Sequence, residues 1–151
     1  MSETKALVAL LLLIYNDRML LVKTRIGASA IHGTGLFANE FIPKGTTIWE
    51  FTPGFDLYVK AADIGRLPAA AQAQMLKYCY RDRETGQYVL CADDARFLNH
   101  SDQPNTVDMP GPEGCTIATR DIPIGEELTC DYQTFDADFR EKLLRDSGDR
   151  R

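Results

Sequence analysis

Residues 96–105 read RFLNHSDQPN, and they set three polar side chains directly after an apolar pair. A strand at this point would deliver Asn99, His100 and Ser101 to one place, as binding and catalytic sites often require. A serine hydrolase is disfavoured, because Ser101 has no glycine-flanked nucleophile elbow around it. A metal cluster is disfavoured as well, because the chain has only two histidines. The stretch therefore indicates a polar site of another kind.

Two further segments carry chemistry, one upstream and one downstream of this stretch. Gly33-Thr34-Gly35 forms a turn between apolar residues, and residues 125–132 read GEELTCDY. A lone pair of glycines most often only makes a turn, and here it lacks both the longer fingerprint and the βαβ unit of a dinucleotide-binding fold. The downstream segment alone would be a turn with two solvated glutamates that leads into a strand. Each segment by itself is a weak indication of function.

The three segments together, in this order, resemble the SET-domain family of protein lysine methyltransferases. The resemblance covers roughly residues 19–135. It implies a mainly β fold of the α+β class, the SET-domain β-clip, in which short strands and small sheets surround a knot-like crossing, with one inserted helix and a C-terminal helix. It also implies S-adenosylmethionine as the cofactor and a lysine side chain of a basic protein, a histone or another, as the methyl acceptor.

The resemblance also assigns roles to individual residues. Tyr132 matches the active-site tyrosine of the family, whose phenol lies beside the transferring methyl group and orients the incoming amine. The substrate channel is expected to include Tyr80, Tyr88 and Cys130, although core packing is the default for at least two of Tyr78, Tyr80 and Tyr88. The residues expected to bind the cofactor, or to support the crossing beside it, are Gly33, Thr34, Gly35, Arg96, Phe97, Asn99, His100 and Phe135.

Two departures from the family pattern bear on the site. Asp102 stands where the family usually has a zinc-binding cysteine, and the later cysteines of that zinc site are absent, so no metal is expected. The cofactor lid would then come from Phe135 and a helix over residues 138–144. Cys130 stands where the family commonly has Phe or Tyr, and its smaller side chain predicts that more than one methyl group can be added. Ordinary packing of Cys130 is the alternative.

The composition fits one domain with a mildly acidic surface. The chain has 151 residues and 44% hydrophobic content, enough for one buried core. Its net charge of −5, from 17 basic and 22 acidic residues, argues against direct nucleic-acid binding and suits a basic protein partner, with plain solubility as an equal alternative. The four cysteines are widely scattered, so we expect reduced thiols and an intracellular protein, cytoplasmic in a prokaryote, with a nuclear location open in a eukaryotic or viral source.

The apolar run over residues 6–15 is too short to cross a bilayer, which takes ~20 residues, and it lacks the cleavage site of a signal peptide. No membrane association is expected. The run fits a buried strand, or a strand that pairs with a second copy in a homodimer. We therefore divide the chain into an N-terminal extension or strand (1–18), a SET domain (19–135) and a C-terminal helix or tail (136–151).

Short strands separated by glycine and proline account for most of the chain. Residues 111–114 read GPEG, a strong turn signal, so the runs on either side should pair as a hairpin. Residues 41–48 and 121–128 share the order Ile-Pro-x-Gly, which predicts the same strand-turn-strand corner twice. The clearest strands are predicted over residues 20–23, 46–51, 88–92 and 115–119.

Two helices are predicted. The first covers residues 67–80, with Pro68 in its first turn, where a missing N–H costs nothing. The second covers residues 138–145, with Asp138 as its cap. The residues expected on the buried stripe of the first helix are Ala69, Ala73, Leu76 and Tyr80. Those expected to share one face of the second are Phe139, Leu143 and Leu144.

Two other functions remain as alternatives. The first is a non-catalytic SET-like module that binds a peptide or the cofactor without turnover, and the presence of Asn99, His100 and Tyr132 speaks against it. The second is a small β domain that binds a sugar or another ligand, which is suggested only by the proline-glycine corners and leaves RFLNHS unexplained. The expected function is therefore an S-adenosylmethionine-dependent protein-lysine N-methyltransferase.

Overall fold

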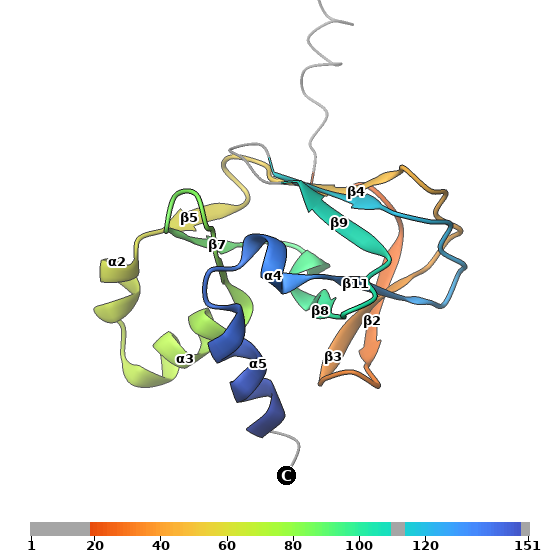
Figure 1. Cartoon of the computed structure of the whole chain (residues 1–151). Helices are drawn as coiled ribbons and strands as arrows, with labels where there is room; N and C mark the ends of the chain where they lie inside the picture. Colours follow the sequence, from red (N-terminus) through yellow and green to blue (C-terminus); the bar gives the residue numbers. More distant parts are fainter. Residues whose placement is uncertain (1–18, 110–113, 149–151) are drawn as a thin grey trace, which may run out of the picture.

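The computed structural model describes residues 19–109 and 114–148. Most of this part is short strands in three small sheets, joined by a few short helices (Figure 1), which confirms the predicted mainly β architecture. Two predictions lie wholly or mainly outside the described residues. They are the strand over residues 6–15 and the turn over residues 111–114.

The first sheet has four antiparallel strands in the order β1-β4-β10-β9. The hairpin predicted on either side of the glycine-proline turn is confirmed, because Cys115 pairs with Met109 and Ala118 with Thr106. The predicted first strand is shorter than expected and ends at Leu20. The strands are β1 (Met19–Leu20), β4 (Thr47–Glu50), β10 (Cys115–Ala118) and β9 (Thr106–Met109).

The second sheet joins the segments that carry the chemistry. Its order is β2-β3-β11-β8, and β8 runs parallel to β11, with Asn99 beside Thr129 and His100 beside Cys130. Among the described strands this is the one parallel ladder, and it lies where the knot-like crossing was predicted. It brings two strand ends that are 30 residues apart in the chain to one place. The strands are β2 (Thr24–Ala28), β3 (Thr34–Ala38), β11 (Glu127–Cys130) and β8 (Asn99–His100).

The third sheet belongs to a lobe that is inserted between β4 and β8, drawn from yellow to green in Figure 1. It contains β5 (Leu57–Val59), β7 (Tyr88–Leu90) and β6 (Tyr80–Arg81), together with α2 (Ala61–Gly65) and α3 (Ala69–Tyr78). A 3-10 turn, η1 (Asp94–Phe97), leads into β8, and α4 (Tyr132–Phe135) and α5 (Phe139–Gly148) follow β11. Within the described residues, no helix has the length and apolar character needed to cross a membrane.

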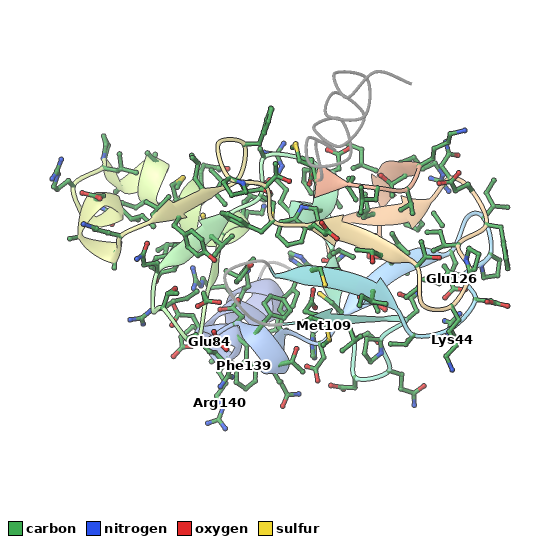
Figure 2. All side chains as sticks on the ribbon, turned by 90° about the horizontal axis from the view of Figure 1, so that it is seen from above. Lys44, Glu84, Met109, Glu126, Phe139 and Arg140 are labelled. Carbon is green, nitrogen blue, oxygen red and sulfur yellow. The ribbon has the colours of Figure 1, made fainter. Side chains whose placement is uncertain are left out.

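The predicted pair of corners is confirmed. Ile42 and Ile122 exchange both backbone hydrogen bonds, at 3.0 and 2.8 Å, so the two corners face each other across the core. Gly45 and Gly125 have φ values of +82° and +89°, which only glycine adopts without strain. The corners lie well away from α5, as the positions of Lys44 and Phe139 show in Figure 2.

Two apolar clusters hold the sheets together, one between the first two sheets and one that reaches into the inserted lobe. Burying each large aliphatic side chain contributes roughly 1.5–3 kcal/mol. The first cluster contains Leu36, Ala38, Ile42, Ile48, Ala118, Ile122 and Leu128. The second contains Trp49, Phe51, Val89, Cys91 and Ala95.

The predicted buried stripe of the first helix is wrong. Ala69 and Ala73 are exposed, and none of the residues of α3 is fully buried. The helix ends at Tyr78, because Cys79 adopts an extended conformation (φ −85°, ψ 151°) and leads directly into β6, where Tyr80 lies. Tyr80 therefore points from a strand rather than from the helix.

The second predicted helix exists as α5, but its inward face is different. Leu144 is 72% exposed, so it does not share a buried face with Phe139. The inward residue is Lys142, whose side chain is only 14% exposed. Asp138 lies at the predicted cap position, where its backbone carbonyl accepts the Lys142 N–H at 3.1 Å, and its carboxylate accepts hydrogen bonds from Tyr88 and Arg81.

Candidate functional site

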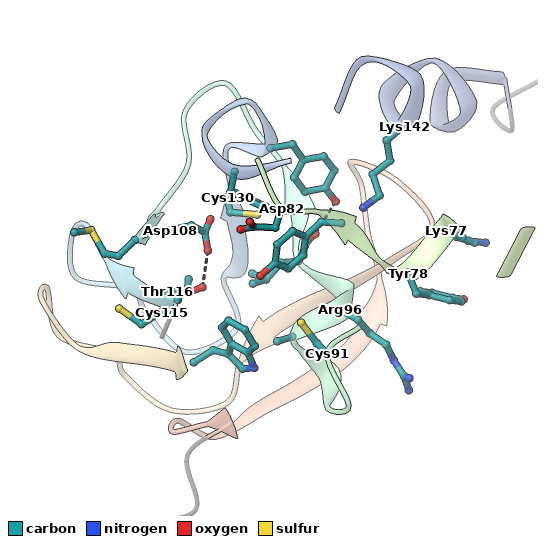
Figure 3. A pocket seen from close by; sticks show the side chains of 18 residues that line it. Lys77, Tyr78, Asp82, Cys91, Arg96, Asp108, Cys115, Thr116, Cys130 and Lys142 are labelled. Carbon is teal, nitrogen blue, oxygen red and sulfur yellow. Dashed lines mark hydrogen bonds between the residues drawn. The ribbon is translucent and has the colours of Figure 1, made fainter. Parts of the chain in front are cut away.

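Two neighbouring cavities lie where α4 and α5 meet the ends of β8 and β11. The aromatic cavity, of about 80 Å³, is lined by Trp49, Tyr80, Cys130, Phe135 and others (Figure 3). The basic cavity, of about 120 Å³, is lined by His32, Gly33, Thr34, Phe97, Asn99 and others. Six residues line both cavities, so the two share a wall: Lys77, Tyr78, Arg96, Leu98, Tyr132 and Lys142.

Tyr132 stands in the shared wall at the first position of α4. The carboxylate of Asp131 starts this helix by accepting the Gln133 N–H at 2.9 Å. The Tyr132 side chain is buried, and its hydroxyl donates to the carbonyl oxygen of Leu98 at 2.7 Å. The phenol is thereby fixed between the two cavities, which is where the residue predicted as catalytic should lie if each cavity holds one reactant.

His100 holds the backbone of Tyr132. Its Nδ1 accepts the Tyr132 N–H at 3.2 Å, so the ring proton sits on Nε2, which faces the carboxylate of Asp102 at 3.2 Å. Asp102, the residue that replaces a family cysteine, thus orients the histidine ring. His100 lines neither cavity, and its expected contact with the cofactor stays a prediction.

Asn99 ties the glycine turn to β8. Its side chain is buried, and its Nδ2 lies within hydrogen-bonding distance of the carbonyls of His32 (3.0 Å) and Thr34 (3.2 Å) and of Glu127 Oε1 (2.9 Å). These bonds fix the turn that carries Gly33 against the strand that leads to Tyr132. Asn99, Gly33 and Thr34 therefore meet in the wall of the basic cavity, and their contact with a cofactor stays a prediction.

The two glycines of the turn serve different needs. Gly33 has φ +48° and nothing within 4 Å of where a side chain would start, so its main chain faces open space in the basic cavity. Gly35 lines neither cavity, and a Cβ there would lie 2.3 Å from Glu127 Oε1. The half-buried Glu127 accounts for glycine at position 35, and a cofactor contact at this residue stays a prediction.

Three cationic side chains enclose the shared wall. The Lys142 ammonium donates to the carbonyl of Cys79 at 2.9 Å, lies 3.4 Å from Asp136 Oδ2, and sits 5.1 Å from the centre of the Tyr132 ring. Lys77 and Arg96, from α3 and η1, line the same wall. The basic cavity is therefore suited to a ligand that carries an anionic group.

The aromatic cavity has walls of stacked rings and small thiols. Phe135 packs edge-on against Tyr80 and Tyr132, with ring centroids 5.0 and 6.0 Å apart. Burial raises the pKa of the thiols of Cys91 and Cys130, so both are protonated and uncharged at neutral pH. The cavity can accept an unbranched aliphatic chain between aromatic faces.

Two predicted site residues lie elsewhere than expected. Phe135, expected at the cofactor, lines the aromatic cavity and not the basic one. Tyr88, expected in the substrate channel, lines neither of these cavities. Its hydroxyl donates to Asp138 at 2.8 Å, and burial together with this bond raises its pKa to about 12. The channel role of Tyr88 stays a prediction, with docking of α5 as its observed contact.

Sequence reasoning missed four charged residues of the walls, which are Lys77, Asp82, Asp108 and Lys142. For Asp108 a signal existed: in β9 the polar Thr106 and Asp108 face inward, while the apolar Val107 and Met109 are 39% and 48% exposed. This pattern is the reverse of an ordinary amphipathic strand and indicates a polar interior site. For Lys142 the sequence gives no signal, because one lysine in a charged helix looks like any other.

Comparison with known proteins identifies one family over most of the chain. The family described as "SET domain" matches residues 33–133. A histone-lysine N-methyltransferase of Chaetomium globosum, named as specific for H3 lysine 4, is 33% identical over 116 residues, which cover 72% of this chain and 11% of that protein. Human histone-lysine N-methyltransferase 2B is 30% identical over 140 residues, covering 82% of this chain and 5% of that protein. The chain thus spans only a small part of the curated relatives it matches.

Solved structures show the same fold. Polycomb Repressive Complex 2 of Chaetomium thermophilum, bound to GSK126, matches with a TM-score of 0.61 at 22% identity, over 82% of this chain and 17% of that chain. A Plasmodium falciparum protein described as a histone methyltransferase matches with a TM-score of 0.54 at 21% identity, over 75% of this chain and 95% of that one. At these identities the likeness concerns the fold alone.

Proposed function

The chain belongs to the SET-domain family, and from this membership and the geometry of its cleft we propose that it is an S-adenosylmethionine-dependent protein-lysine N-methyltransferase. Relatives named as histone-lysine methyltransferases support lysine methylation as the reaction. The observation that carries the proposal is the placement of the Tyr132 hydroxyl, held by the Leu98 carbonyl, in the wall between a basic and an aromatic cavity.

The residues of the basic cavity fit S-adenosylmethionine. The amino-acid carboxylate of this molecule matches the cationic wall of Lys77, Arg96 and Lys142, and the open main chain at Gly33 allows close approach. The cofactor would supply one methyl group carried on a positively charged sulfur. Asn99 would hold the glycine turn in place against it, through its bonds to the carbonyls of the turn.

The aromatic cavity would hold the substrate lysine. A free lysine has a pKa near 10.4, so loss of its proton at neutral pH costs roughly 4 kcal/mol. Desolvation between the rings of Tyr80 and Phe135 and the positive charge of Lys142 both disfavour the ammonium form. Tyr132 then fixes the direction of approach of the amine, and good alignment of reacting atoms can be worth ~7–11 kcal/mol. A basic protein as substrate suits the net charge of −5.

Methyl transfer itself tests the proposal. The protein is incubated with a cofactor that carries a labelled methyl group and with a panel of histones and other basic proteins, and modified lysines are mapped by mass spectrometry. We expect labelled lysines with the native chain and a loss of about 100-fold or more with Tyr132→Phe, which lacks the anchored hydroxyl. Tyr58→Phe is the matched control, because Tyr58 is on β5 and lines neither cavity.

Two results would contradict the proposal in different ways. Cofactor binding by calorimetry without any transfer would favour the non-catalytic module. Absence of cofactor binding would remove the function altogether.

A further inference from the structure

Asp108 has a buried carboxylate oxygen that accepts no hydrogen bond from the part of the chain that the structure describes. Its Oδ1 accepts a hydrogen bond from the Thr116 hydroxyl at 2.6 Å, across the β9–β10 pair (Figure 3). Its Oδ2 is shielded from solvent and has no hydrogen-bond partner among the described residues. Leaving a buried charged acceptor unpaired is costly, and native proteins rarely do so without a function for the group. Because Asp108 lines the aromatic cavity, a molecule inside this cavity can supply the missing donor.

The fold places Asp108 close to Cys130, which lines the same cavity. Thr106 on β9 donates to the carbonyl of Thr129 on β11 at 2.9 Å, so the two strands lie together. Asp108 follows Thr106 by two residues and Cys130 follows Thr129 by one, and both line the aromatic cavity. The small thiol leaves space in front of the carboxylate that a phenylalanine or tyrosine would fill. Figure 3 shows the Asp108 carboxylate lying near Cys130.

On the premise of the proposed methyltransferase activity, we propose that Asp108 accepts a hydrogen bond from the substrate nitrogen in the channel and so limits methylation to two groups. The reacting amine must turn its lone pair toward the methyl donor. An unmodified amine then keeps two N–H groups for the channel wall, a monomethyl amine keeps one, and a dimethyl amine keeps none. The first two transfers can use the Asp108 acceptor, and a third cannot.

Each methyl transfer forms and breaks the same bonds. The lone pair of the amine forms the N–C bond, the C–S bond breaks with its electron pair left on sulfur, and the sulfonium becomes a neutral thioether. The product is a methylated ammonium, which must release a proton to bulk water before the next transfer. Asp108 remains an acceptor throughout, and its charge favours the ammonium form, so desolvation between the rings and the charge of Lys142 must outweigh it before each transfer. Burial raises its pKa to about 6, against a lowering by the Thr116 bond, so it is mostly ionised at pH 7.5.

The native protein offers the first test. Peptides that carry an unmodified, a monomethylated or a dimethylated target lysine are compared as substrates at pH 7.5, and products are read by mass spectrometry when the unmodified and monomethylated forms have just been consumed. We expect similar rates for the first two peptides, a rate about 10-fold or more lower for the third, and dimethyllysine as the main product. A monomethyl end point, or rapid conversion to trimethyllysine, would overturn the inference without touching the proposed function.

Variants supply the second test. Asp108→Leu keeps the branching of the side chain and removes the acceptor, so the first transfer should slow by about 10- to 100-fold, the loss expected for a hydrogen bond to a charged group. The product should shift from dimethyl- toward trimethyllysine. Thr116→Val removes the other bond of Asp108 and keeps the free acceptor, so dimethyllysine should remain the end product. An unchanged product ratio in Asp108→Leu, with cofactor binding intact, would sink the inference, while loss of transfer in the native chain would sink the proposed function instead.

Discussion

Asp108 should cost the protein stability at neutral pH. Its folded-state pKa of about 6 lies above the usual value of 3.8 because burial disfavours the charge. The folded state therefore binds the proton more tightly than the unfolded state, and the free energy of unfolding falls as pH rises from about 4 to 6. The loss is at most about 3 kcal/mol, from a shift of about two units.

Asp108→Asn should remove this loss. We expect the variant to be more stable than the native chain at pH 7.5 and to lose the advantage near pH 4, measured by urea unfolding at both pH values. The groups around Asp108 do not account for this difference in stability. Burial raises the pKa of Tyr80, Cys115 and Cys130, so they stay protonated between pH 4 and 7.5. Asp131 is present in both proteins. Equal stability of the two proteins at pH 7.5 would contradict the raised pKa.

An exposed carboxylate provides the control. Asp63 lies on α2 with half of its side chain in solvent, and its contact is an exposed ion pair with Arg66. Asp63→Asn should leave the pH dependence unchanged, since surface pairs contribute little to stability.

At the scale of single residues, the sequence motifs predicted some of the residues in the cavity walls and missed others. Asn99 and Tyr132 could be placed from the sequence, because the order of the three segments is typical of a family in which they meet. Asp108 and Lys142 could not, because their roles depend on which strand and helix lie opposite. The inward direction of Asp108 follows from its strand alternation, but its orphan oxygen follows only from the packing of β9 against β11.

At the scale of elements, the residue of α5 in the cavity wall is a cation, because Lys142 is 14% exposed while the apolar Leu144 is 72% exposed. The Lys142 ammonium lies 5.1 Å from the centre of the Tyr132 ring and reaches the Cys79 carbonyl, just past the C-terminus of α3, where negative charge of the helix dipole gathers. The carboxylate of Asp136, which is 1% exposed, completes the site. The sequence predicted that this helix exists, but one partner of its inward lysine, the Cys79 carbonyl, lies 63 residues upstream.

Lys142→Met should weaken both the docking of α5 and the basic cavity. We expect unfolding free energy to fall by about 1–3 kcal/mol, because Asp136 and the Cys79 carbonyl lose a donor. We also expect S-adenosylmethionine affinity, measured by calorimetry, to fall about 10-fold or more. Lys44→Met is the matched control, since Lys44 lies at the far end of the molecule (Figure 2) and should change neither quantity. Unchanged affinity in Lys142→Met would exclude this cation from cofactor binding.

At the scale of the whole molecule, the cleft depends on contacts between distant parts of the chain. The glycine turn, the inserted lobe, β8, β9, β11 and α5 all contribute to its walls. Local patterns predicted the strands, the two corners and the position of the helices. They did not predict that α4 and α5 close the lobe against the sheets. This packing depends on contacts between distant residues, such as the backbone bridge between Asp82 and Asp136, which are 54 residues apart.

Contacts between Arg81 and residues 136–137 indicate where the domain ends on its C-terminal side. The carboxylate of Asp136 accepts the Arg81 N–H at 3.1 Å, and the Ala137 N–H donates to the Arg81 carbonyl at 2.8 Å. Removing residues 136–151 would leave both groups of Arg81 and the carbonyl of Cys79 without partners, at a cost of about 1–3 kcal/mol each. It would also remove Lys142 from the wall of both cavities. The domain should therefore extend through α5 rather than end at Phe135.

Two shortened chains test this boundary. A chain that ends at Phe135 should unfold at a urea concentration well below that of the full chain, and it should lose cofactor binding. A chain that ends at Gly148 retains α5 and every contact described for it, so it should match the full chain in both measurements. If the chain that ends at Phe135 kept its unfolding midpoint and its affinity, α5 would be an appendage and the division at residue 135 would stand. We expect the chain that ends at Phe135 to lose stability, because the removed segment contains the hydrogen-bond partners of β6 on the side away from β7.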